Sequence, residues 1–249
     1  METGVGYRPL LLVLGLVLLL RLPFLNQAIQ GDDIVYITEG AHALIDPLHP
    51  GSTGYVFRGN EVDLQGHPHP PSYGWFLAPL IAAFGGVREI PFHAVYMLFS
   101  LIAAWAMWSL ARRFSPHPLC ATLLFLAVPA FVVNGTSLET DLPFLAFWMA
   151  AIALFLVDAR LARVLSALAM ALAALTAYQA VFLTPILAVY IWLFHRRDRA
   201  RWLAILVPPV VIASWQIFQR FSTGALPATV VAGYFSFYQT LHAKITIFG

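Results

Sequence analysis

Apolar residues fill most of the chain in stretches of helical length, and polar residues gather between those stretches. A full membrane crossing takes about 20 residues, and several of the stretches are shorter. The pattern therefore defines the ends of the predicted spans only to within a few residues. The pattern nevertheless predicts an all-α, polytopic membrane helical bundle of about seven spans, forming a single domain over residues 1–249. The predicted spans lie near residues 9–25, 91–111, 118–133, 142–157, 163–178, 180–195 and 202–218.

The polar segment at residues 26–90 separates the first two predicted spans. It contains one further apolar run, Ser72–Gly86, which follows three prolines and has Pro79 in its middle. At that length, an interfacial or re-entrant helix competes with a crossing. The segment is therefore predicted to be an outer-face loop that carries interfacial helices.

Composition places the chain among membrane proteins. It has 249 residues, of which 60% are hydrophobic and 10% charged, whereas a soluble domain has about 25% charged residues. Such a chain could not cover a water-exposed surface, so we expect membrane lipid as a partner and no nucleic acid. The single Cys120 excludes an internal disulfide framework and a cysteine zinc site.

The arginines decide the sidedness of the predicted bundle. If residues 72–86 do not cross and the N-terminus is cytoplasmic, nine of the fourteen basic residues lie inside. Nine of the twelve acidic residues then lie outside. A crossing at 72–86 would put either the arginine-rich loops or Arg8 on the wrong face, so the positive-inside rule favours the interfacial helix. The inner basic residues are Arg8, Arg112, Arg113, Arg160, Arg163, Arg196, Arg197, Arg199 and Arg201.

The first apolar run is interpreted as a retained anchor helix rather than a signal peptide. It follows Arg8, lacks a clear small-x-small cleavage site and is interrupted near its end by Arg21-Leu-Pro23. The prediction is a multi-pass integral membrane protein with a cytoplasmic N-terminus. In a bacterium it would lie in the inner membrane.

Two acidic pairs stand where predicted spans meet the outer face. Asp32 and Asp33 are adjacent, so on a helix their side chains point about 100° apart and cannot serve one point. One could act in chemistry while the other caps a helix or binds a cation. Glu139 and Asp141 precede the span at 142–157. Asp141 suits a helix N-cap as well as it suits a functional carboxylate.

Other polar residues are expected on the same face. His67 and His69 lie in a proline-rich, extended segment, where they could bind a phosphate or a metal or simply remain solvated. Asp33 and His69 are the candidate ligands of a divalent metal ion. Tyr178 and Gln179 follow the span at 163–178. An interfacial cavity could gather all of these groups.

The order of these features resembles the GT-C membrane glycosyltransferases, in particular the protein mannosyltransferase and aminoarabinose transferase group. The resemblance covers roughly residues 9–220 and depends on the order of three motifs more than on any one of them. The motifs are Gly31-Asp32-Asp33-Ile-Val-Tyr36, His69-Pro70-Pro71-Ser-Tyr73-Gly-Trp75 and Thr140-Asp141-Leu-Pro143-Phe144.

The resemblance implies transfer of a sugar from a polyprenyl-phosphate donor to an acceptor at the outer face of the membrane. Asp32 matches the family's general base and Asp141 its second active-site carboxylate, with Asp33 and Glu139 as secondary acids. The groups expected to contact the donor phosphate are Arg58, His67, His69, Tyr178 and Gln179. The sugar and the acceptor are not specified.

Two features depart from the family pattern. Relatives often have a lysine after the fifth span, where this chain has Tyr178 and Gln179, which supply hydrogen bonds but no charge. Relatives are also about twice as long, so the chain is expected to be an N-terminal fragment or a truncated product. The alternatives are therefore a catalytically silent truncated relative and a multi-pass transporter. Transporters favour internal repeats and charges in the middle of the membrane, and neither is evident here.

Overall fold

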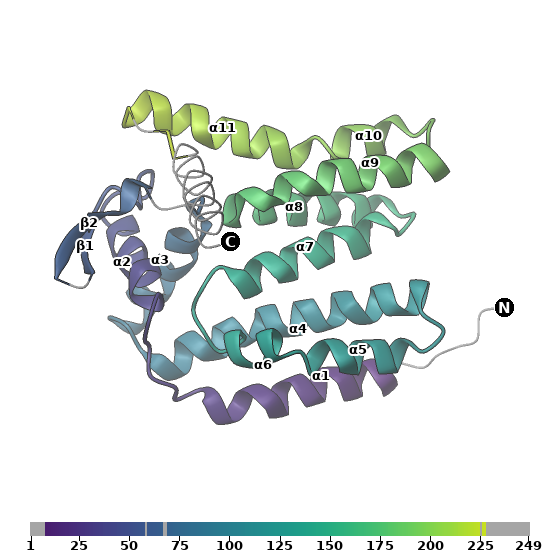
Figure 1. Cartoon of the computed structure of the whole chain (residues 1–249), viewed down its shortest axis with the longest axis horizontal. Coiled ribbons are helices and arrows are strands. Elements are labelled where there is room, and N and C mark those ends of the chain that lie inside the picture. Colours follow the sequence, from purple (N-terminus) through teal and green to yellow (C-terminus); the bar gives the residue numbers. More distant parts are fainter. Residues whose placement is uncertain (1–7, 58, 67–68, 225, 228–249) are drawn as a thin grey trace, which may run out of the picture.

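The computed structural model describes residues 8–57, 59–66, 69–224 and 226–227 of the chain, and it is an elongated bundle of helices (Figure 1). Prolines begin several helices, because their missing N–H has no intrahelical partner in the first turn. The helices along the bundle are α1 (Arg8–Arg21), α4 (Glu89–Phe114), α5 (Pro118–Leu126), α6 (Pro129–Asn134), α7 (Asp141–Phe155), α8 (Arg160–Thr176), α9 (Leu183–Phe194), α10 (Arg199–Ala204) and α11 (Val207–Ser222).

Each predicted span coincides with one helix or with two consecutive helices. The span expected at 118–133 is divided, because Pro129 starts the new helix α6 after α5 has ended. The span expected at 180–195 begins with a 3-10 helix, Tyr178–Phe182, which leads into α9. The ends differ from the predictions by a few residues, as expected for soft boundaries.

Two segments of the described chain are long and apolar enough to cross a membrane on their own. They are Glu89–Phe114 and Arg199–Ser222, of which the second joins α10 and α11. The other predicted spans coincide with shorter or interrupted helices. Seven crossings are therefore not confirmed, although the helical architecture is.

Alanines form much of the closest packing between the long helices. Ala103, Ala104 and Ala106 of α4 are fully buried, and α4 packs against α7, which packs against α8. Small side chains let helices approach closely, which maximises dispersion contacts where burial from water contributes little. The corresponding alanines of α7 and α8 are Ala146, Ala150, Ala151, Ala169, Ala173 and Ala174.

The segment predicted as a loop with interfacial helices forms a small unit at one end of the bundle. It contains α2 (Asp33–Ala43), the antiparallel hairpin β1 (Gly54–Phe57) and β2 (Asn60–Asp63), and α3 (Ser72–Phe84). Helices α2 and α3 pack against each other at glycines: a Cβ on Gly40 of α2 would lie 2.7 Å from Leu77 Cβ of α3, and one on Gly74 of α3 would lie 3.2 Å from the Glu39 carbonyl oxygen of α2. This close contact places α2 across the end of the bundle (Figure 1).

Arginines occupy the opposite end, where α7 ends. Arg113 donates from Nη1 to the Leu156 carbonyl at 2.8 Å, and buried Arg201 donates to the Phe155 carbonyl at 3.1 Å. Arg201 also pairs with Asp198 at 3.2 Å. The last carbonyls of a helix lack intrahelical donors and carry partial negative charge, so the two guanidinium groups stabilise the end of α7.

Candidate functional site

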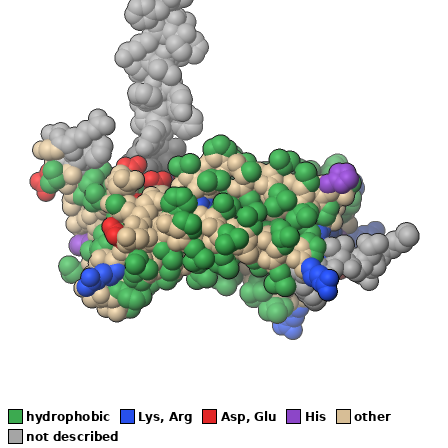
Figure 2. Space-filling model, turned by 90° about the horizontal axis from the view of Figure 1, so that it is seen from below, with side chains coloured by type: hydrophobic (Ala, Val, Ile, Leu, Met, Phe, Trp, Pro, Cys, Tyr) green, Lys and Arg blue, Asp and Glu red, His purple; other side chains and the backbone are tan. Residues whose placement is uncertain are grey.

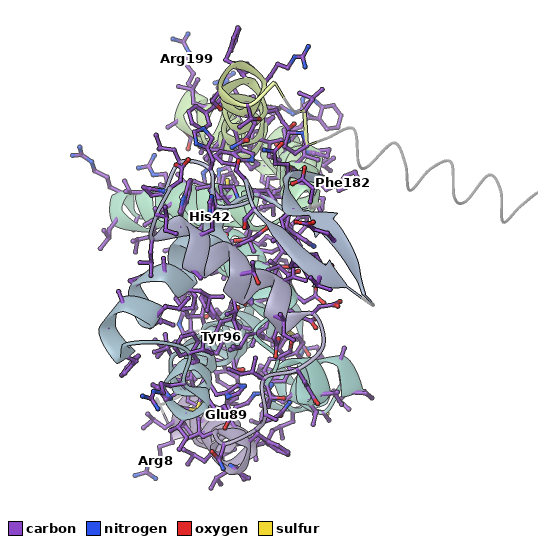
Figure 3. The ribbon with its side chains drawn as sticks, turned by 90° about the vertical axis from the view of Figure 1, so that its left-hand side faces the viewer. Arg8, His42, Glu89, Tyr96, Phe182 and Arg199 are labelled. Atoms are coloured by element: carbon purple, nitrogen blue, oxygen red, sulfur yellow. The ribbon has the colours of Figure 1, made fainter. Side chains whose placement is uncertain are left out.

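Four acidic residues meet at the end of the bundle that carries α2 and the hairpin. On the face drawn in Figure 2, the visible acidic side chains gather at this end, while hydrophobic side chains cover the middle of the bundle. Figure 3 views the end directly, with His42 of α2 and Tyr96 of α4 near the centre. The four acids are Asp32, Asp33, Glu139 and Asp141.

The adjacent aspartates at the start of α2 have different environments. Asp33 is 2% exposed, and its Oδ1 accepts hydrogen bonds from Ser137 Oγ at 2.8 Å and from the Leu138 N–H at 2.7 Å. Asp32 is exposed, and its side chain makes no capping bond to α2. The structure therefore gives Asp33 a positional role and leaves the Asp32 carboxylate facing solvent. Asp32 occupies the N-cap position of α2, although its side chain makes no capping bond.

The Asp33 bonds hold the segment that connects α6 to α7, residues 135–140. Tyrosines fix the same segment from two other helices. The Tyr73 hydroxyl of α3 donates to the Glu139 carbonyl at 2.6 Å, and the Tyr96 hydroxyl of α4 donates to it at 3.1 Å. Because this carbonyl is held from two sides, the backbone beside Asp141 has a defined position.

Asp141 is the first residue of α7 and is exposed. Thr140, not Asp141, precedes the helix as its N-cap, and it makes no side-chain cap bond. The predicted N-cap role of Asp141 is therefore incorrect by one residue. A carboxylate in the first turn is still favoured there by the helix dipole.

Glu139 is half-buried between the other acids. The pKa of its carboxyl is raised, first by burial and then by the nearby charges of Asp33, Asp141 and Asp32, against a lowering contribution from a hydrogen bond to Ser137. Like charges that share a site disfavour ionisation of one another. Glu139 therefore holds a proton more readily than an ordinary exposed glutamate does.

His69 connects the acidic residues to the proline-rich segment. Its Nδ1 lies 3.4 Å from Thr140 Oγ1, which in turn lies 3.4 Å from the Tyr36 hydroxyl. The rings of Tyr36 and His69 lie 6.1 Å apart in an edge-to-face arrangement. This network therefore holds His69 beside Thr140, the residue that precedes Asp141 in the chain. Arg58 and His67 fall outside the described residues.

Tyr178 and Gln179 lie at the same end of the bundle. Ser72 of α3 and Thr176, two residues before Tyr178, have hydroxyl oxygens 3.0 Å apart. The Tyr178 hydroxyl accepts a hydrogen bond from Gln216 of α11 at 2.8 Å, and Gln179 is exposed. The sequence thus correctly predicted that these polar groups lie at one end of the bundle. Contact between them and the phosphate of a sugar donor stays a prediction.

Asp33 and His69 were the candidate ligands of a possible divalent metal ion. Among the described residues, no group of three or more histidines, cysteines, aspartates or glutamates could hold a metal ion. Both hydrogen bonds from residues 137 and 138 occupy the Oδ1 atom of Asp33. Metal dependence therefore stays a prediction.

Sequence reasoning missed the supporting role of Arg21, at the end of α1. This buried guanidinium donates to Ser100 Oγ at 3.0 Å, to the Val132 carbonyl at 2.8 Å and to the Phe131 carbonyl. A Cβ added to Gly135 would collide with it. The interaction fastens the end of α6 just before the segment that reaches Asp33. An arginine inside an apolar run was the available signal, because such charges are rarely without a partner.

A comparison with protein-family models matches residues 68–218 to the dolichyl-phosphate-mannose-protein mannosyltransferases. The match covers more than half of the 249 residues. The chain belongs to this family. The matched region of this mannosyltransferase-family member includes Glu139 and Asp141, whereas Asp32 and Asp33 precede it. No curated protein and no solved structure matches the chain.

The unequal environments of Asp32 and Asp33 predict unequal effects on stability. Asp33→Ala leaves the Ser137 hydroxyl and the Leu138 N–H without their acceptor, and we expect a loss of about 1.5–3 kcal/mol in unfolding free energy. Asp32→Ala is the matched control and should change it by less than about 0.5 kcal/mol. Thermal unfolding of both variants in detergent measures the difference. Equal losses would contradict a buried, bonded Asp33.

Glu139 predicts a pH dependence of stability. The folded-state pKa of Glu139 is raised above the ordinary 4.5. Between the ordinary pKa and the raised one, the folded protein therefore binds more protons than the unfolded chain does. The free energy of unfolding then falls as pH rises through this interval. Glu139→Gln should therefore raise the unfolding temperature at neutral pH. The gain should vanish near pH 4, where the carboxyl is protonated in both states. A gain in unfolding temperature that is the same at both pH values would refute a raised pKa of Glu139 in the folded protein.

Proposed function

We propose that the chain is a membrane glycosyltransferase that moves a sugar from a polyprenyl-phosphate donor to an acceptor hydroxyl at the outer face. Membership of the mannosyltransferase family supports the reaction class. The observation that carries the proposal is the solvent-facing Asp32 carboxylate beside a fixed segment that bears Glu139 and Asp141.

In the proposed reaction, Asp32 acts as general base. Its carboxylate takes the proton from the acceptor hydroxyl while the hydroxyl oxygen forms a bond to the anomeric carbon of the sugar. The bond between that carbon and the lipid phosphate breaks, and the phosphate leaves with the electron pair. A proton held by Glu139 would limit the negative charge around the departing phosphate.

The donor phosphate needs positive charge or hydrogen-bond donors at this end. His69 is held beside Thr140 and could supply a donor. Arg88, the residue before α4, and Arg220 of α11 are exposed. Arg58, His67, Tyr178 and Gln179 complete the set proposed to contact the donor. No step is assigned to a metal ion.

The proposed topology has the acidic end outside and the arginine end inside, with the seven predicted spans crossing between them. The separation of charge between the two ends supports it. Arg112 and Arg113 lie in the last turn of α4, and Arg199 and Arg201 lie in α10, whereas the acids surround α2 and the start of α7. The positive-inside rule then orients the bundle.

Cysteine labelling tests this topology. In a Cys120→Ala background, a cysteine that replaces exposed Glu61 of the hairpin should react with a membrane-impermeant maleimide on intact cells. A cysteine that replaces exposed Arg197 should react only after the membrane is opened. Labelling of both positions from outside, or the reverse pattern, would refute the proposed sidedness.

Single-turnover transfer from dolichyl-phosphate mannose and related polyprenyl-phosphate sugars tests the reaction. Asp32→Asn should lower the rate by at least about 100-fold, the usual contribution of a general base. Glu61→Gln, which removes an exposed acid on the hairpin, should leave the rate unchanged. If both variants transfer as fast as wild type, Asp32 is not the base. If folded wild type transfers nothing, a silent relative or a transporter becomes the better hypothesis.

A further inference from the structure

An open hollow lies in the turn that connects α9 to α10, at the end of the bundle opposite α2 (Figure 1). Its volume is about 430 Å³, which falls in the range of roughly 300–1,000 Å³ for small-molecule sites. The lining combines basic and apolar side chains. It consists of Leu193, Phe194, His195, Arg196, Arg197 and Asp198.

The positive charge of this hollow is not neutralised by its own acid. Asp198 Oδ1 accepts hydrogen bonds from the Ala200 and Arg201 N–H groups at 3.1 and 3.2 Å, and its Oδ2 accepts one from Arg201 Nε at 3.2 Å. Arg196 and Arg197 are both exposed, and among the described residues no carboxylate pairs with either. The hollow therefore has a net positive charge and favours an anion.

The Arg196 side chain is held in one place. Its guanidinium carbon lies 4.5 Å from the centroid of the Trp192 ring, and its Nε donates to the Trp192 carbonyl. The Trp202 Nε1 fixes the same turn by donating to the Arg196 carbonyl at 3.1 Å. These contacts leave the outer N–H groups of the guanidinium for a ligand. A planar guanidinium can bind two oxygens of one phosphate.

Apolar surface adjoins the basic groups. Leu193 and Phe194 each expose more than half of their surface, and so do Trp192 and Leu203 on the neighbouring turns of α9 and α10. Tryptophan concentrates where the hydrocarbon of a membrane meets the headgroups. A ligand that has both an anionic head and apolar chains would use the whole surface, whereas a free phosphate would contact only the arginines.

We propose that this hollow binds one anionic phospholipid of the surrounding bilayer. Arg196 and Arg197 bind its phosphate, and Leu193 and Phe194 pack against its acyl chains. Arginines beside a membrane surface attract anionic lipids over zwitterionic ones. The site lies at the opposite end from the acidic residues, so its occupancy is separate from the proposed sugar transfer.

Titration of phosphatidylglycerol into the full chain in detergent, followed by native mass spectrometry, tests the proposal. Phosphatidylcholine with the same acyl chains is the zwitterionic reference and should bind more weakly to wild type. The Arg196→Gln/Arg197→Gln double variant should bind phosphatidylglycerol about 30-fold more weakly, because each arginine near a lipid surface contributes about fivefold. Unfolding temperatures check that the variants fold.

Arg112→Gln/Arg160→Gln is the matched control. Both arginines are exposed and lie at the same end of the bundle but outside the hollow, so this variant loses the same charge and should bind phosphatidylglycerol as wild type does. An equal loss of affinity in the two double variants would show only a general positive potential at this end and would overturn a defined site.

Three other results would also overturn the proposal. They are unchanged affinity in the Arg196→Gln/Arg197→Gln variant, equal affinity of wild type for the two lipids, and displacement of the lipid by inorganic phosphate at the same concentration. If the double variant unfolds, Arg197→Gln alone keeps the contact between Arg196 and Trp192 intact. Its affinity for phosphatidylglycerol should be about fivefold lower than that of wild type, and an unchanged affinity would contradict the site.

Discussion

The buried carboxylate of Asp33 determines how the candidate site is assembled. It joins the start of α2 to residues 137 and 138, more than 100 positions along the chain. Burial of a charged group is costly unless hydrogen bonds compensate for it, so α2 and the segment before α7 are required to meet where those bonds can form. Asp32 faces solvent because Asp33 faces inward, and Glu139 and Asp141 stand nearby because their backbone follows the bonded residues.

The same requirement recurs elsewhere in the bundle. Arg21 binds carbonyls at the end of α6, and Arg113 and Arg201 bind carbonyls at the end of α7. In apolar surroundings, backbone carbonyls at helix ends need donors from the protein itself. Polar side chains near the ends of the helices therefore hold short helices together, while the middle of the bundle packs through alanine and aromatic side chains.

The sequence predicted the helices well and the site only in outline. Apolar runs located the long helices of the bundle within the described residues, and arginine placement grouped the acidic residues at one end, because both signals are local or additive along the chain. The different environments of Asp32 and Asp33 were not predictable, since they depend on contacts with Ser137 and Leu138. Arg21 was missed for the same reason, because its partner Ser100 is distant in sequence.

The alanines between α4, α7 and α8 have a consequence for the entropy of ordering. Alanine has no side-chain rotamers to lose, so fixing these contacts costs backbone freedom alone. The end with the acidic residues is built from tyrosine, glutamate, glutamine and tryptophan, whose side chains lose several rotamers when they are held. The alanine contacts are therefore the least costly part of the bundle to order, whereas holding the side chains of the acidic end costs rotamer entropy during folding.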